Sequence, residues 1–137
     1  MNQETLLNEA EGYGLLQKYG IPVPRHSLTT TRDEAVEVAG KIGFPVVLKI
    51  VSPDIIHKSD AGGVVTGVTG ADMVRQSFDA IVAAAQRFQP GCRITGVIVE
   101  EELPKKGIEL LIGGKRDPTF DFIDCPRLPS DSVLTRR

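Results

Sequence analysis

The chain has 137 residues, of which 41% are hydrophobic and 25% are charged, the usual balance of a globular protein with a single core. Its 16 Lys and Arg against 18 Asp and Glu give a net charge of −2, which disfavours nucleic-acid binding because the basic excess that holds a phosphate backbone is missing. No apolar run approaches the ~20 residues of a membrane span, and the polar start lacks the features of a signal peptide. We therefore expect a cytoplasmic chain with no membrane or nucleic-acid partner.

The two cysteines, Cys92 and Cys125, lie far apart in the sequence. They form no CxxC motif and no cluster with histidine, so neither a disulfide framework nor a structural zinc site is supported. We expect free thiols and no metal ligands in this chain.

Three segments carry the signals of helices. The first, over about residues 9–19, follows Asn8 and Glu11, which have the spacing of a capping box. Cap residues, stop signals and apolar residues at spacings of three and four predict two further helices, over about residues 32–42 and 71–88.

Short β-branched runs predict the strands. An extended stretch is expected over about 25–28, followed by strands over residues 46–51, 64–68, 94–101 and 108–112. The resulting order of strand, loop, strand, helix and strand predicts an α/β (α+β) domain with helices packed on a mixed sheet.

Lys49 is the only charged residue of the best-predicted strand. An ammonium group in a buried strand must be paired or must line a cleft, because burying an uncompensated charge costs several kcal/mol. Two interpretations stay open: an exposed edge strand or structural ion pair, and a lysine that coordinates phosphate.

The loop that follows, residues 52–63, ends in His57-Lys58-Ser59-Asp60-Ala61-Gly62-Gly63. Glycines let backbone N–H groups turn toward an anion, and Ser59 and Lys58 add donors, so phosphate is a plausible ligand. The alternative is a polar hairpin loop with a glycine bulge, and His57 alone is most often a surface histidine. Glu100, Glu101 and Glu102 then end a strand, as an acidic turn or as ligands of a metal or a ribose.

Five stretches in this order resemble the ATP-grasp domain of ADP-forming (NDP-forming) acyl-CoA synthetases, such as ADP-forming acetate–CoA ligase. They span residues 9–120 and read EAEGY with YGIPVP, FPVVLK, the loop from SPDI to GG, EEEL, and IELLIG with RDPTF. The resemblance implies the first lobe of an ATP-grasp fold with the start of the second. It also implies ATP or ADP as ligand, Mg²⁺ held by the second lobe, and a CoA-binding (alpha) subunit or domain as partner.

The same resemblance implies roles for single residues. Lys49 corresponds to the lysine that holds the nucleotide phosphates, and the loop from Ser59 to Gly63 corresponds to the glycine-rich loop that closes over them. Adenine would lie at the hinge. The nucleotide-binding candidates besides Lys49 are Lys58, Ser59, Gly62, Gly63, Glu100, Glu101, Leu103 and Glu109.

His57 corresponds to a phosphohistidine that passes a phosphoryl group from an acyl phosphate to ADP. A neutral imidazole is a nucleophile toward phosphorus and leaves readily again from the phosphoramidate. Neighbouring lysines would stabilise the charge of the transferred group.

The family pattern stops after residue 120, which predicts a C-terminally truncated domain. The expected divisions are an N-terminal helix (1–19), a first lobe (20–103), the start of a second lobe (104–120) and a non-family tail (121–137). An edge strand exposed by the second-lobe stub would favour homo-oligomers.

Three functional hypotheses remain. The first is the nucleotide-binding portion of an ADP-forming acyl-CoA synthetase with phosphohistidine transfer. The second is an inactive remnant that acts through self-assembly or a partner, and residues 121–137 bear on that choice. The third is another ATP-grasp ligase, which would not need His57.

Overall fold

The computed structural model describes residues 7–104, 106, 111–117, 119 and 121–127. The chain divides into two compact units, Met1–Leu103 and Pro104–Arg137. Each unit is described separately below.

The first unit contains three helices and a four-stranded sheet. Its elements in chain order are α1 (Glu9–Lys18), β1 (His26–Thr29), α2 (Arg32–Ile42), β2 (Val46–Val51), β3 (Val64–Val68), α3 (Ala71–Phe88) and β4 (Gly96–Glu101). The strand order is β1-β4-β2-β3, and each of the three pairings is antiparallel. The α/β class with helices packed on a sheet is confirmed, while the expectation of mixed pairing is wrong for this sheet.

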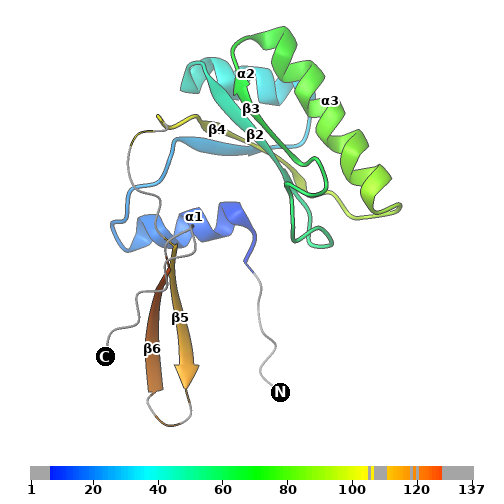
Figure 1. Ribbon diagram of the computed structural model, residues 1–137. Coiled ribbons are helices and arrows are strands. Elements are labelled where there is room, and N and C mark those ends of the chain that lie inside the picture. Colours follow the sequence, from blue (N-terminus) through cyan, green and yellow to red (C-terminus); the bar gives the residue numbers. More distant parts are fainter. Residues whose placement is uncertain (1–6, 105, 107–110, 118, 120, 128–137) are drawn as a thin grey trace. The chain divides into compact units, whose positions relative to one another are not determined.

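The core lies between the sheet and two of the helices, α2 and α3 (Figure 1). Alternate residues of the central strands β2 and β4 point into it, because successive side chains of a strand face opposite sides. They pack against buried residues of the two helices; the core includes Val46, Leu48, Ile50, Val97, Val99, Ala35, Ala39, Val74, Phe78, Ile81 and Ala85.

The opposite face of the sheet carries the polar residues of interest. Lys49 lies between the core residues Leu48 and Ile50 of β2, so its side chain points away from α2 and α3. In the register of the β2–β4 pair, Val47 is opposite Glu100 and Lys49 is opposite Ile98. Lys49 and Glu100 are therefore diagonal neighbours on one face, and α1 lies on that side of the sheet (Figure 1).

Local signals position the helices as predicted. Asn8 and Glu11 form the expected capping box at the start of α1, with distances of 2.8 Å from Asn8 N to Glu11 Oε2 and 3.0 Å from Glu11 N to Asn8 Oδ1. Thr31 and Glu34 do the same for α2. All three predicted helices are confirmed, and none of the helices in the described part of the chain is long and apolar enough to cross a membrane.

The second unit contains an antiparallel hairpin of β5 (Leu111–Asp117) and β6 (Asp121–Arg127). The sequence predicts a strand over 108–112 and no strand beyond 120. Residues 108–110 lie outside the described part, and β5 continues to Asp117. β6 was missed because it includes Pro126, a residue that cannot donate to a strand ladder and so weakens the strand signal.

Candidate functional site

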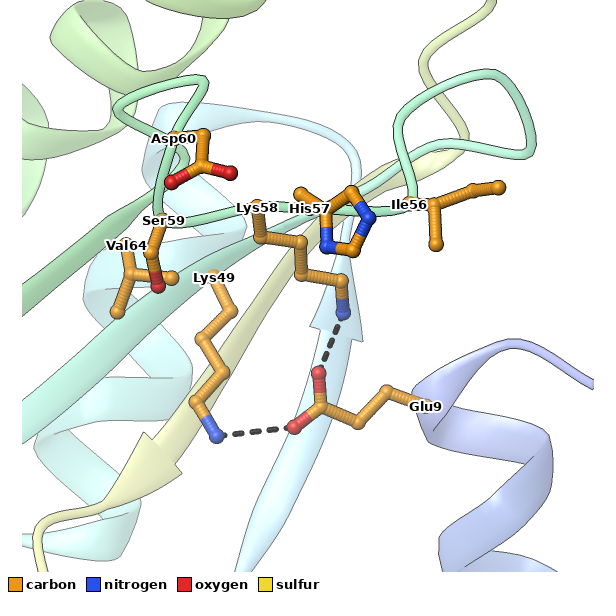
Figure 2. Close-up of a pocket in the computed structure, with 8 residues that line it drawn as sticks. All are labelled: Glu9, Lys49, Ile56, His57, Lys58, Ser59, Asp60 and Val64. Atoms are coloured by element: carbon orange, nitrogen blue, oxygen red, sulfur yellow. Dashed lines mark hydrogen bonds and ion pairs between the residues drawn. The ribbon is translucent and has the colours of Figure 1, made fainter. Parts of the chain in front are cut away.

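A pocket of about 490 Å³ opens on the face of the sheet opposite α2 and α3. Side chains from α1, β2, β3 and the β2–β3 loop line it (Figure 2): Glu9, Lys49, Ile56, His57, Lys58, Ser59, Asp60 and Val64. Two carboxylates, two ammonium groups and an imidazole thus belong to one small volume. Four of these residues, His57, Lys49, Lys58 and Ser59, are candidates from the sequence.

Lys49 is paired on two sides. Its Nζ atom lies 2.9 Å from Glu9 Oε1 and 2.6 Å from Glu100 Oε1, and 22% of its side chain is exposed. Burial alone would lower the pKa of Lys49, but the two carboxylates outweigh it and raise that pKa, so the amine stays charged. The edge-strand interpretation is wrong, because β2 is a central strand; the ion pair and the position at a pocket are confirmed.

Glu9 joins the two lysines. Its second carboxylate oxygen accepts a hydrogen bond from Lys58, so Lys49 and Lys58 converge on one anionic group (Figure 2). Partial burial would raise the pKa of Glu9, but the hydrogen bonds from Lys58 and Lys49 prevail and lower it to about 2. The structure therefore shows an anion held between two lysines, with a carboxylate as the anion.

Tyr13 connects the two carboxylates of the network. Its hydroxyl oxygen is 2.9 Å from Glu100 Oε2 and 3.1 Å from Glu9 Oε1, and its single proton can be donated to one of them at a time. Burial and both carboxylates raise the pKa of the Tyr13 phenol far above its ordinary value. The Tyr13 ring also lies 4.5 Å from the His26 ring, centroid to centroid, which anchors α1 to β1.

The glycines of the loop serve the turn itself. The N–H of Gly62 donates to the Ser59 carbonyl at 3.1 Å, and that of Gly63 donates to the Lys58 carbonyl at 2.7 Å. These two N–H groups are thus engaged within the loop, which leaves its side chains facing the pocket. His57 is exposed, at the pocket wall.

Of the hinge candidates, Glu100 contacts Lys49, whereas Glu101 and Leu103 do not line the pocket. Glu101 pairs with Arg25 at 3.1 Å and its N–H donates to the Arg25 carbonyl, while Leu103 is 56% exposed. Neither residue lines the pocket, whereas Glu100 reaches it through Lys49. Glu109 lies outside the described residues.

Sequence reasoning missed two members of this network. Glu9 entered only as part of a family motif, and Tyr13 only as an apolar position of the first helix. Their spacing of four residues puts them on one helix face, which was the available signal. That this face would meet Lys49 depends on tertiary structure and is not written in the spacing.

The residues that the structure describes do not form a metal centre. Among the described residues, no group of three or more His, Cys, Asp or Glu side chains is placed to hold a metal ion. The nearby carboxylates, Glu9 and Glu100, are already paired with lysines. The described part of the chain therefore fits an anion and does not fit Mg²⁺. Cys92 is a buried free thiol.

Comparison with known proteins shows which family this chain resembles. A family model described as an ATP-grasp domain matches residues 1–123. The chain is 46% identical over 114 residues to the ADP-forming 4-hydroxybutyrate–CoA ligase of Nitrosopumilus maritimus, covering 83% of this chain and 16% of the relative. It is 45% identical over 114 residues to the beta subunit of ADP-forming acetate–CoA ligase I of Pyrococcus furiosus, covering 83% and 49%.

The solved structures that match this chain include proteins of the same kind as these relatives. The dinucleotide-forming acetyl-coenzyme A synthetase 1 of Ca. Korarchaeum cryptofilum, in complex with coenzyme A and Ca-AMPCP, matches with a TM-score of 0.87 and 41% identity, covering 90% of this chain and 54% of that one. Another structure of that protein holds coenzyme A and Mg-AMPPCP, with a phosphohistidine segment pointing towards the nucleotide-binding site. The chain spans about half the length, or less, of these relatives. From its sequence and its fold, the chain belongs to the ATP-grasp domain family, and its relatives include ADP-forming acyl-CoA ligases.

Proposed function

We propose that this chain provides the nucleotide-phosphate-binding part of an ADP-forming acyl-CoA synthetase. One observation carries the proposal: Lys49 and Lys58 converge on a single anion in a pocket that His57 also lines. Two ammonium groups from a central strand and a loop suit a polyphosphate, whose charge they neutralise at short range. The names of the relatives support an acid–thiol ligase, with acyl-CoA, ADP and phosphate converted to acid, CoA and ATP.

His57 would carry the phosphoryl group. In the first step a ring nitrogen attacks the phosphorus of an acyl phosphate, the P–N bond forms and the carboxylate leaves. In the second step an oxygen of the terminal phosphate of ADP attacks the same phosphorus, ATP forms and the neutral imidazole is regenerated. Lys49 and Lys58 would hold the phosphates of ADP and offset the charge on the transferred group.

The remaining parts of the reaction are assigned to other elements. Since the described residues do not form a magnesium site, Mg²⁺ would be held outside them. We propose a CoA-binding subunit or domain as the partner that forms the acyl phosphate, supported by a relative that is named a beta subunit. Two further expectations belong to the proposal: contacts of Glu100, Glu101 and Leu103 with adenine, and closure of the loop with Ser59, Gly62 and Gly63 over the phosphates.

Calorimetric titration with ADP and with ATP tests phosphate binding. We expect saturable binding that weakens about tenfold or more in Lys49→Ala, because a charge-assisted contact is lost. Lys41→Ala is the matched control, since Lys41 is an exposed lysine paired with Glu37 on α2. Equal affinity of wild type and Lys49→Ala would contradict the proposal, and absence of binding by the wild type would favour an assembly role.

Phosphoryl transfer is tested separately. After incubation with ATP and Mg²⁺, phosphorus NMR should detect a phosphoramidate in the wild type and in His26→Gln, and none in His57→Gln. His26 is a fitting control because the chain has two histidines in all. A phosphoramidate that persists in His57→Gln would rule out this role.

A further inference from the structure

The two lysines at the pocket, Lys49 and Lys58, are already paired with carboxylates of the same chain. The ammonium groups of Lys49 and Lys58 face the carboxylates of Glu9 and Glu100, so these four charges sum to zero. A phosphate that contacts both lysines therefore meets amines that are already neutralised. It can gain full charge pairing only if one of the carboxylates leaves.

Glu9 is the carboxylate that can leave. Glu100 is 6% exposed and belongs to β4, which is hydrogen-bonded to β1 on one side and to β2 on the other. Glu9 is the first residue of α1, its side chain is 22% exposed, and it is the group that touches both lysines. Glu9 can move without any change in a strand, whereas the side chain of Glu100 is buried on a strand that is paired on both sides.

The helix that carries Glu9 is held by polar contacts. No residue of α1 is buried, whereas α2 buries Ala35, Ala39 and Ile42 and α3 buries five residues. Side chains of α1 contact the sheet and the β2–β3 loop through Glu9, which pairs with the two lysines, and through Tyr13, which contacts Glu100 and His26. A dissolved anion can compete with the Glu9 carboxylate for the two lysines, and so for the contacts that hold α1.

We propose that α1 is an anion-displaced latch, with the Glu9 carboxylate occupying the place between Lys49 and Lys58 that a nucleotide phosphate takes. The inference rests on the proposed function, since it takes the phosphates of ADP or ATP as the displacing anion. Binding of a polyphosphate expels Glu9 and releases the start of α1. A single carboxylate is outcompeted by a group of higher charge, so the latch favours polyphosphates over singly charged anions.

Calorimetry on the full chain with ADP, and with inorganic pyrophosphate, tests the latch through Glu9→Gln. This variant removes the competing charge and leaves Lys49 paired with Glu100. Glu11→Gln is the matched control: it makes the same charge change two residues away, and a glutamine oxygen can still accept the Asn8 N–H of the capping box. We expect Glu9→Gln to bind both ligands about tenfold more tightly and Glu11→Gln to match the wild type.

Hydrogen exchange gives the second readout. On saturation with ADP, the amides of α1 should exchange faster, while those of α2 and α3 should not. If ADP binds in a Lys49-dependent way but Glu9→Gln is no tighter, or α1 exchange is unchanged or slower, the latch is wrong and the proposed function stands. If neither the wild type nor Glu9→Gln binds ADP, the proposed function fails and the latch fails with it.

Discussion

Glu9 shows how a single carboxylate links stability to the site. Its pKa of about 2 in the folded chain lies below the ordinary value of 4.5. A depressed folded-state pKa adds stability that is fully present above the unfolded pKa and is lost as the pH falls through the folded one. The window for Glu9 therefore runs from about pH 5 down to about pH 2.

We expect Glu9→Gln to flatten the acid side of the stability curve. Across that window the wild type should lose about 1 to 2 kcal/mol more than the variant, a value reduced for partial exposure to solvent. Urea unfolding followed by circular dichroism at a series of pH values measures the difference. Asp54, whose pKa is also lowered to about 2 by Arg93, titrates in both chains and cancels. Parallel curves would show that the two lysines do not stabilise Glu9 as the distances indicate.

At the scale of single residues, the sequence indicates which side chains need a partner better than it indicates which residue that partner is. Lys49 could be recognised because a lysine inside an apolar strand demands a partner, and that partner was found. Its second partner, Glu9, comes from a helix 40 residues earlier. No local spacing encodes that contact, so the bridging carboxylate and Tyr13 became visible only in the folded chain.

Among the elements, the β2–β3 loop depends on one close approach. A Cβ atom on Gly63 would lie 2.4 Å from Ile50 Cγ2 and 3.0 Å from the Lys58 carbonyl oxygen. Ile50 is a fully buried core residue, so neither neighbour can give way cheaply. Gly63 thus fixes the loop against β2, and with it the positions of His57 and Lys58.

We predict that Gly63→Ala lowers the free energy of unfolding by about 1 to 3 kcal/mol through overpacking. Gly40→Ala on α2 is a control for which we expect the opposite change in stability, because no atom outside its chain neighbours and the backbone of its own helix lies within 4 Å of the added Cβ. Alanine in an exposed helix should stabilise by about 0.5 to 1 kcal/mol. Thermal or urea unfolding of the two variants gives both values, and a Gly63→Ala variant as stable as the wild type would show that the loop can shift away from Ile50.

The helices could be predicted from cap residues and apolar spacing within their own segments, whereas the pairing of the strands could not. The capping boxes at Asn8 and Thr31 and the apolar spacing of α3 define helices without reference to the rest of the chain. The pairing of strands is a long-range property, so the antiparallel register of β2 with β4 could not be derived from the runs alone. β6 was missed for a related reason, since it is a strand through its pairing with β5, which is also a long-range property.

At the scale of the whole molecule, the described core belongs to the first unit. Every residue of the hydrophobic core cluster lies between Ala35 and Val99. In the described part of the chain, β5 and β6 form a two-stranded sheet of their own. A unit with its own sheet and core is expected to fold by itself.

We therefore predict that residues 1–103 alone keep the fold of the first unit. Their unfolding in urea should be cooperative, with a free energy within about 1 kcal/mol of the full chain for the transition of this unit. A chain ending at residue 95 is the control, and it should not fold, because it lacks β4, the strand that joins β1 to β2. If residues 1–103 unfold without cooperativity, the second unit supplies packing that the sheet needs. If they fold and bind ADP with the affinity of the full chain, the phosphate site is a property of the first unit alone.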